Sequence, residues 1–348
     1  MTRQTWTALV SAIVFVACAA GLALIPTPYI TWSPGSTTDV LSAPGGKPTV
    51  EITEVRTYDT PGELDLTTVS VTTSDSRLAL PEALIAYWLP DRDTLPRESV
   101  YQPGKSADQV EAEEAQMMQS SQNEAVVAAL RAADQPVTER VQVGAVTING
   151  PAQDRLKPGD FVVAVDDVAV KRYDQVAELV RKHKVGDSVS FVVDRGRQRL
   201  SVSIIAGASR NNPDVAAVGI SVQPGYSHTA QVGFGIDPEI GGPSAGLIFA
   251  LAIYDRLTPA PLVDGRHVAG TGEIDVDGNV GAIGGINQKI VGAEKAGATI
   301  FLVPAANCTD VATGVTDLRL VKVDTLETAI SALTDLGDPA MAASVPGC

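Results

Sequence analysis

Ser244 lies in a glycine-rich segment of a kind that can activate a nucleophile. Residues 241–246 read Gly-Gly-Pro-Ser-Ala-Gly and precede an apolar run from Leu247 to Tyr254 that predicts a helix. Proline suits a first helical turn, and glycine lets the backbone approach a bound carbonyl group closely. Backbone N–H groups at a helix start would point beside the Ser244 hydroxyl, where an oxyanion needs donors. A hydroxyl that only caps the helix is the alternative interpretation of this segment.

A nucleophilic serine needs a base, and the histidines of this chain do not suit that role. Gly-x-Ser-x-Gly is typical of the nucleophile elbow of α/β-hydrolases, which carry an acid and then a histidine well downstream. Only His267 follows Ser244, at close range. Chemistry of the β-lactamase type needs Ser-x-x-Lys, but Leu247 stands at the lysine position. A lysine elsewhere in the chain is the remaining candidate for the base.

Three blocks resemble the proteolytic domain of the Lon family and occur in that family's order. They are residues 242–246 (Gly-Pro-Ser-Ala-Gly), residues 270–286, which begin Gly-Thr-Gly-Glu-Ile, and residues 288–304, which begin Gln-Lys-Ile-Val-Gly-Ala. The resemblance implies that Ser244 is the nucleophile, Lys289 the general base and Thr271 a hydroxyl neighbour that orients the lysine amine. We expect backbone N–H groups near Gly242 and Ser244 to hold the oxyanion.

Lys289 has the sequence surroundings of a desolvated lysine. Ile286, Ile290 and Ala293 lie around it, and burial disfavours an ammonium group, so the amine is expected to be neutral near working pH. A surface lysine paired with an acidic neighbour is the alternative interpretation for Lys289 taken alone.

The chain also departs from the ATP-driven Lon proteases. Gly241 stands where many of them carry an acidic residue, which bears on how the site is held in its active form. The phosphate-loop motif Gly-x-x-x-x-Gly-Lys-[Ser/Thr] does not occur. We therefore expect no cofactor and no ATP dependence, and substrates that are flexible or already unfolded.

Residues 137–207 resemble a bacterial PDZ domain. The resemblance rests on residues 150–152 (Gly-Pro-Ala) and on the Leu-Lys-Pro-Gly-Asp turn at 156–160, which leads into the apolar strand at 161–165. Further strands are predicted at 141–148, 188–194 and 200–205, with an amphipathic helix at 173–182. The resemblance implies a groove that captures a peptide, usually a C-terminus, as an added strand. A generic β-rich packing domain is the alternative.

The N-terminal region predicts a membrane anchor. Residues 6–26 carry no charge and are long enough to span a bilayer. Arg3 precedes this run and the next basic residue is Lys47, which favours a cytoplasmic N-terminus with everything after residue 26 outside. A cleaved signal peptide is the competing interpretation, since small residues lie at cleavage-like positions. A lipoprotein cysteine at Cys18 is disfavoured because Phe15 stands where such a signal usually has Leu.

The predicted class is α+β, with an N-terminal transmembrane helix, a PDZ-like β-rich domain and a Lon-type proteolytic α/β domain. The expected boundaries are an anchor at 1–26, a stalk at 27–48, a strand and helix region packing with the peptidase at 49–136, the PDZ-like domain at 137–207, the proteolytic domain at 208–336 and a tail at 337–348.

The region at 49–136 has its own expected elements. A strand pair is expected at 50–58 and 66–72, followed by helices at 81–88 and 111–133 with a polar loop at 90–103 between them. Met117 and Met118 are interpreted as core-filling residues. Residues 117–123 also fit a family of membrane-anchored PDZ and Lon-like peptidases, in which the PDZ unit interrupts the surrounding fold.

Charge and composition limit the partners. The formal net charge of -15 argues against a nucleic-acid partner, because phosphates would be repelled. The three histidines are scattered and no Cys-x-x-Cys occurs, so no metal site is expected. Cys308 and Cys348 are able to pair outside the cell, but the sequence leaves their pairing open. A homo-oligomer is implied by resemblance only, since Lon-like domains often form rings.

These observations together predict a single-pass cell-membrane protein with its catalytic domain on the extracytoplasmic side. Its predicted activity is that of an ATP-independent serine endopeptidase with a Ser-Lys dyad, acting on polypeptides that the PDZ-like domain captures. The alternative is a catalytically silent PDZ-type peptide-binding envelope protein.

Overall fold

The computed structural model describes residues 3–23, 25–42, 49–73, 75–89, 91–314 and 316–348. The chain divides into two compact units, which we call the large unit (Met1–Gln135 with Ala230–Cys348) and the β-rich unit (Pro136–Thr229). The β-rich unit therefore interrupts the large unit in sequence. The α+β class that the sequence predicts is confirmed.

The large unit contains most of the helices. Its elements are α1 (Arg3–Ala23), β1 (Tyr29–Asp39), β2 (Val50–Thr53), β3 (Glu63–Val71), α2 (Leu80–Trp88), β4 (Asp93–Pro96), α3 (Arg97–Val100), α4 (Ala107–Ala132), β13 (Gln231–Phe234), α6 (Gly246–Leu257), β14 (His267–Gly270), β15 (Glu273–Ile274), β16 (Val280–Gly281), α7 (Ile286–Ala296), β17 (Ile300–Pro304), the 3-10 helix η2 (Ala305–Asp310), β18 (Arg319–Val323), α8 (Leu326–Gly337) and the 3-10 helix η3 (Ala342–Ser344). Among the described helices, only α1 is long and apolar enough to cross a membrane, and none of its residues is buried.

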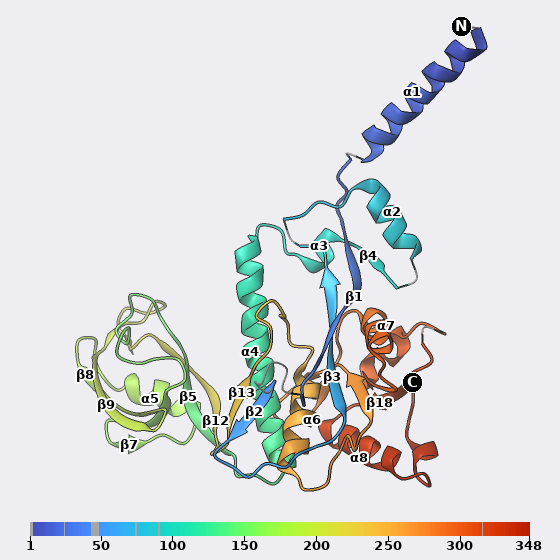
Figure 1. Cartoon of the computed structure of the whole chain (residues 1–348). Helices are drawn as coiled ribbons and strands as arrows, with labels where there is room; N and C mark the ends of the chain where they lie inside the picture. The colour runs from blue at the N-terminus through green and yellow to red at the C-terminus, as the bar shows by residue number, and fades with distance from the viewer. Residues whose placement is uncertain (1–2, 24, 43–48, 74, 90, 315) are drawn as a thin grey trace. The chain divides into compact units, whose positions relative to one another are not determined.

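A six-stranded mixed sheet forms the centre of the large unit, in the order β18-β17-β14-β3-β1-β4 (Figure 1). Strands β3, β14, β17 and β18 run parallel, whereas β1 is antiparallel to both of its neighbours. Strand β17 is buried along its whole length, as expected for a parallel strand that is covered on both faces.

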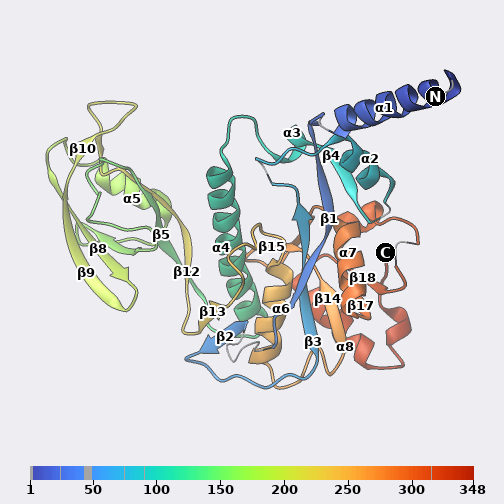
Figure 2. The ribbon, with the colours of Figure 1, turned by 45° about the horizontal axis from the view of Figure 1, so that its top comes forward.

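Helices α6 and α7 cover opposite faces of this sheet. Helix α7 shares a hydrophobic cluster with Ala269 of β14. A Cβ atom on the next residue, Gly270, would instead lie 3.0 Å from Ile248 of α6. Because successive residues of a strand point to opposite faces, the two helices lie on different sides. Helix α4 packs against α6 (Figure 2), so that the predicted apolar helix at 247–254 is confirmed as the buried helix α6.

The stalk expected at residues 27–48 is wrong for residues 29–39, which form β1 inside the central sheet. Its register shifts between Pro34 and Thr37, so the Pro/Gly-rich composition marks a β-bulge within a strand. Position 35 requires glycine because Thr68 lies very close to its backbone. A Cβ atom at this position would lie 2.2 Å from the Thr68 hydroxyl. Residues 43–48 of the expected stalk lie outside the described residues.

The strand pair expected at 50–58 and 66–72 is also wrong. Strand β2 pairs with β13, and β3 pairs with β1 and β14. The turn at 61–62 does not close a hairpin, because the Pro61 carbonyl accepts a hydrogen bond from the Gly265 amide instead (2.9 Å). The expected polar loop at 90–103 contains β4 and α3, since β4 pairs with the start of β1.

The β-rich unit consists of β5 (Thr138–Val146), β6 (Phe161–Val165), β7 (Val168–Ala169), α5 (Tyr173–Val180), β8 (Ser188–Arg195), β9 (Gln198–Ile205), β10 (Gly207–Ala208), β11 (Ala216–Ala217) and β12 (Ile220–Ser227). Its sheet runs β12-β5-β6-β8-β9, with β7 paired to β6. The four predicted strands and the helix are confirmed. The expected end at residue 207 is corrected to Thr229, because β12 pairs with β5 along its whole length.

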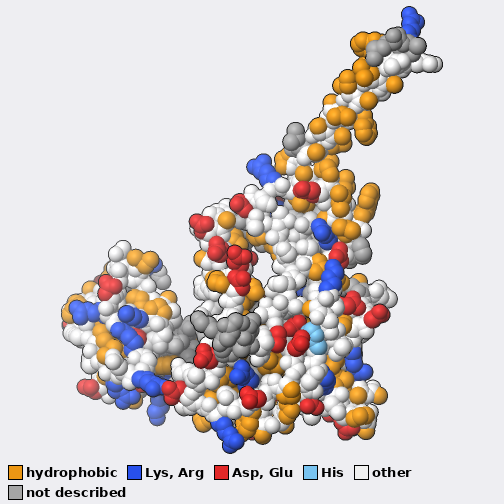
Figure 3. Space-filling view, viewed as in Figure 1, with side chains coloured by type: hydrophobic (Ala, Val, Ile, Leu, Met, Phe, Trp, Pro, Cys, Tyr) orange, Lys and Arg blue, Asp and Glu red, His pale blue; other side chains and the backbone are white. Residues whose placement is uncertain are grey.

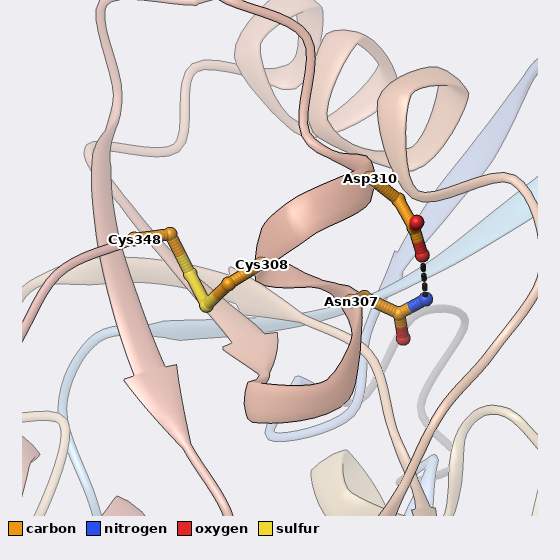
Figure 4. The surroundings of a disulfide bond; sticks show 4 residues. All are labelled: Asn307, Cys308, Asp310 and Cys348. Atoms are coloured by element: carbon orange, nitrogen blue, oxygen red, sulfur yellow. Dashed lines mark hydrogen bonds between the residues drawn. A yellow bond between two sulfur atoms is a disulfide. The ribbon is translucent and has the colours of Figure 1, made fainter.

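The C-terminal residues pack onto the large unit. Cys348 forms a disulfide with Cys308 of η2 (Figure 4). The backbone of Pro346 accepts a hydrogen bond from the Lys322 amide (3.0 Å), and Val345 is buried. The expected tail at 337–348 is thus joined to η2 by the disulfide and to the edge strand β18 by a backbone hydrogen bond.

We predict that Cys348→Ser lowers the melting temperature of the protein. The disulfide closes a segment with a sequence separation of 40, for which loop-closure entropy gives at most about 4 kcal/mol of stabilisation. Calorimetry of the full chain with and without reductant measures this effect. The control is Cys18→Ser, since Cys18 is a free cysteine on α1 and its replacement should leave the transition unchanged. Identical transitions for oxidised and reduced wild-type protein would contradict the prediction.

Candidate active site

Ser244 lies in a turn that directly precedes α6. The helix begins at Gly246, two residues after Ser244, so the expected first helical turn at Pro243 is corrected to a non-helical turn. The Ser244 carbonyl accepts hydrogen bonds from the Gly272 amide (2.8 Å) and from the Thr271 hydroxyl (3.0 Å). The Leu247 amide in turn donates to the Gly272 carbonyl (3.0 Å). These bonds fix the turn to the segment that follows β14.

Lys289 projects from α7 to the same place. Its amine Nζ lies 2.7 Å from the Ser244 hydroxyl and 2.9 Å from the Thr271 hydroxyl. The side chain is only 3% exposed, and Ile286 and Ile290 of the same helix are buried beside β14 and β17. Burial lowers the pKa of Lys289 to about 7, while the negative charge of Glu273 opposes that decrease.

Thr271 lies between the other two residues. It is 1% exposed and directly follows β14, whose last residue is Gly270. Its hydroxyl accepts a hydrogen bond from the Lys289 amine and donates one to the Ser244 carbonyl. The second bond uses the only proton of the hydroxyl. The structure thus brings together the three side chains expected at the site, although they are 18 to 45 positions apart in sequence.

Gly242 does not offer the backbone donor that the sequence led us to expect. Its backbone has φ of +85°, and its amide donates to the Glu114 carbonyl of α4 (3.1 Å). The expectation for Gly242 is therefore corrected, because that N–H group already has an acceptor. Among the described residues, no intramolecular acceptor is found for the amides of Ser244 and Ala245. These two N–H groups, just before the first residue of α6, are the candidates for binding an oxyanion.

Helix α4 contributes to this site, although no residue of this helix was among the site residues expected from the sequence. The Ser121 hydroxyl, buried in the large unit, donates to the Pro243 carbonyl (2.8 Å). The sequence contains a signal for this contact. Met118, Ser121 and Ala125 follow helical spacing, so a polar residue lies on the buried face of the helix. Met118 is buried as expected, but the core-filling interpretation of Met117 is wrong, because this side chain is 43% exposed.

Met117 instead lines a cavity of about 380 Å³ beside the site. The lining residues are Glu113, Gln116, Met117, Ser120, Ser121, Glu124 and Pro243. Burial raises the pKa of Glu124, and the carboxylates of Asp275 and Glu273 raise it further. In the described part of the chain, no group of three or more His, Cys, Asp or Glu residues has the arrangement of a metal site.

Comparison with known proteins identifies both domains. Residues 232–334 match the model of the Lon protease C-terminal proteolytic domain, and residues 116–205 match that of the PDZ domain. The chain carries a PDZ domain and a Lon proteolytic domain. Both resemblances seen in the sequence are thereby confirmed. Ser244, Thr271 and Lys289 all fall within the Lon match. The PDZ match begins inside α4, although the structure places that helix in the large unit.

Two curated relatives illustrate the Lon similarity. Lon protease 2 of Herpetosiphon aurantiacus is 48% identical over 69 residues, which are 20% of this chain and 8% of that protein. Lon protease of Rhizobium meliloti is 30% identical over 142 residues, 36% of this chain and 17% of that protein. The chain thus matches less than a fifth of either relative. The PDZ domain of the SdrC-like protein from Listeria monocytogenes aligns with 24% of this chain and 86% of its own, at 25% identity and a TM-score of 0.22.

Proposed function

We propose that this protein is a membrane-anchored, ATP-independent serine endopeptidase that cleaves unfolded or flexible polypeptides with a dyad of Ser244 and Lys289. The observation that carries the proposal is the buried Lys289 amine, 2.7 Å from the Ser244 hydroxyl. A desolvated lysine with a pKa of about 7 is half neutral at that pH, and only the neutral amine can accept a proton.

The proposed reaction begins with attack of the Ser244 oxygen on the carbonyl carbon of the scissile peptide bond. Neutral Lys289 takes the hydroxyl proton as the C–O bond forms, and then gives that proton to the leaving amine as the C–N bond breaks. Water hydrolyses the resulting ester with Lys289 again as base. Thr271 is a positioning residue, because an N–H bond to its hydroxyl leaves the amine lone pair directed at Ser244.

The developing oxyanion would be stabilised by the amides of Ser244 and Ala245. Both N–H groups lie at the start of α6, where the helix dipole also favours negative charge. The cavity between α4 and Pro243 is lined by the residue that precedes Ser244 and offers room for a substrate side chain. The scissile bond has to reach Ser244 beside the buried Lys289 and Thr271, which an extended segment can do more readily than a folded domain, and this supports flexible or unfolded polypeptides as substrates.

The test of this function is cleavage of reduced, unfolded casein by the full chain in detergent micelles. The proposal expects peptide products with and without added ATP, and none from Ser244→Ala prepared in the same way. A well-folded wild-type protein that releases no peptides under these conditions would contradict the proposal. That result would favour the catalytically silent peptide-binding protein.

We predict that α1 remains as an uncut anchor, with the rest of the chain outside the cytoplasmic membrane. Arg3 on the N-terminal side supports this orientation, and the disulfide between Cys308 and Cys348 suits an oxidising compartment. The protein should stay in the membrane fraction after alkaline washing and retain its first residues by N-terminal sequencing. A soluble form that begins near residue 24 would identify α1 as a cleaved signal sequence.

We further predict that the PDZ domain raises the local concentration of long substrates. Strand β12 lies at a sheet edge with α5 packed nearby, which supports peptide capture by strand addition. Thr138 pairs with Ser227, so the ends of residues 136–229 are adjacent and a short Gly-Ser linker can replace them. The replacement should raise the KM for casein several-fold and leave the hydrolysis of a short peptide unchanged. Equal KM values for casein in two folded proteins would exclude this role.

A further inference from the structure

Helix α2 exposes an apolar face that no described residue covers. The exposed fractions of its large side chains are 48% for Leu84, 58% for Ile85, 71% for Tyr87 and 78% for Trp88. Ala83 and Ala86 are buried and attach the opposite side of the helix to the large unit. Figure 3 shows hydrophobic side chains gathered over α2. Contiguous apolar surface of this kind marks an interaction site in a soluble domain.

The start of α2 is fixed to the residues that directly follow α1. The Thr27 amide donates to the Leu78 carbonyl (2.8 Å), and the Leu80 amide donates to the Ile25 carbonyl (3.1 Å). An isolated bridge between Pro26 and Ala79 lies between these two bonds. These contacts therefore hold the start of α2, and with it the apolar face, next to the end of the apolar helix α1, as Figure 1 also shows.

The residue types of this face suit a lipid surface. Tryptophan and tyrosine are enriched where a bilayer meets water, because their rings are apolar and each carries one polar group. Two exposed arginines, Arg77 and Arg92, flank α2 and can reach lipid phosphates. The acidic residue of the helix, Glu82, accepts a hydrogen bond from the Ala79 amide as part of the helix cap.

From these observations we infer that α2 is an interfacial helix whose apolar face inserts into the outer headgroup region of the bilayer that α1 spans. The inference rests on the proposed anchor. Two attachments would hold the Lon domain at a defined orientation to the membrane, whereas α1 alone would act as a tether. The segment after α2 also contacts α7, since Asp91 pairs with Lys295 (3.1 Å) and Asp93 accepts from Gln288 (2.9 Å). The membrane contact would thus lie beside the helix that carries Lys289.

Tryptophan quenching by brominated lipids tests the inference on the full chain. The vesicles contain phosphatidylcholine and phosphatidylglycerol at about three to one, with bromine on the upper acyl chain. The variant Trp6→Phe retains Trp32 and Trp88 as fluorophores. The brominated lipids should quench the emission of this variant, and the emission should be shifted to shorter wavelength. The quenching should be lost in Trp6→Phe/Trp88→Phe. A matched control adds Met341→Trp, an exposed position beyond α8, to the double variant and should show no quenching.

The chain with Trp88→Phe alone reports on the anchor through Trp6. Quenching of Trp6 without quenching of Trp88 would overturn the interfacial role of α2 and leave the anchor intact. Failure to quench either tryptophan would overturn both proposals. Protection of Trp88 from aqueous acrylamide without quenching by the brominated lipids would also overturn the inference. That outcome would identify a second copy of the chain, or another protein, as the partner of this face.

Discussion

Lys289→Met and Ser244→Ala should each reduce casein cleavage by roughly 10³-fold or more, because each removes one half of the proposed nucleophile and base. Methionine retains the volume of the buried lysine and removes its amine. Since the two residues act as a unit, the double variant should lose little beyond either single variant. Turnover by the full chain in micelles, followed by the release of new amino groups, measures these rates.

Two further variants sharpen this prediction. Lys289→Arg should fail as completely as Lys289→Met, because guanidinium stays protonated and cannot act as a base. Thr271→Val should reduce the rate less, since it removes only the hydroxyl that orients the amine. Circular dichroism of each variant controls for folding. Activity of Lys289→Arg close to that of wild type would contradict a lysine base.

The pH dependence of cleavage should follow the protonation of Lys289. Burial lowers the pKa of this amine to about 7, so the active neutral form should increase as pH rises through 7 and level off above about 8. A lysine with an ordinary pKa would give a rate that still rises at pH 9. The profile of kcat/KM for a short peptide between pH 5 and 9 distinguishes the two cases. A rate that is independent of pH across this range would contradict the proposed base.

The same shift in pKa has a consequence for stability. Lys289 has a pKa of about 7 when folded, compared with the ordinary value of 10.5 for an unfolded chain. Between those values the unfolded chain binds the proton that the folded chain lacks, so the free energy of unfolding rises with pH over this window. Below pH 7 both states carry the proton and this contribution is constant. In Lys289→Met the same rise should be absent from denaturant unfolding curves.

The sequence predicted the site better than it predicted the framework around the site. Ser244, Thr271 and Lys289 belong to three ordered blocks with a recognisable spacing, and the apolar run after Ser244 specified α6. The amide of Gly242 was misjudged because its acceptor, the Glu114 carbonyl, lies on a helix far away in sequence. Such a contact depends on tertiary packing, which no local pattern encodes.

The misread stalk has a specific physical cause. Proline, glycine, serine and threonine usually indicate loops, but in β1 they serve a bulged strand between two partners. The hydroxyls of Thr31 and Thr72 form a hydrogen bond with each other (2.9 Å). Gly35 has no side chain and so permits the close approach of Thr68. Helix α7 packs against β1. The segment that resembled a linker therefore helps to position the helix that carries Lys289.

The most direct test of the Ser244 and Lys289 dyad is the intact mass of the full chain after treatment with a fluorophosphonate probe. The proposal expects one adduct, located by peptide mapping on Ser244, with a labelling rate that rises through pH 7. Labelling should be absent in Ser244→Ala and at least about 10²-fold slower in Lys289→Met. Labelling of Lys289→Met at the wild-type rate, or an unlabelled Ser244 in folded wild-type protein, would contradict the dyad.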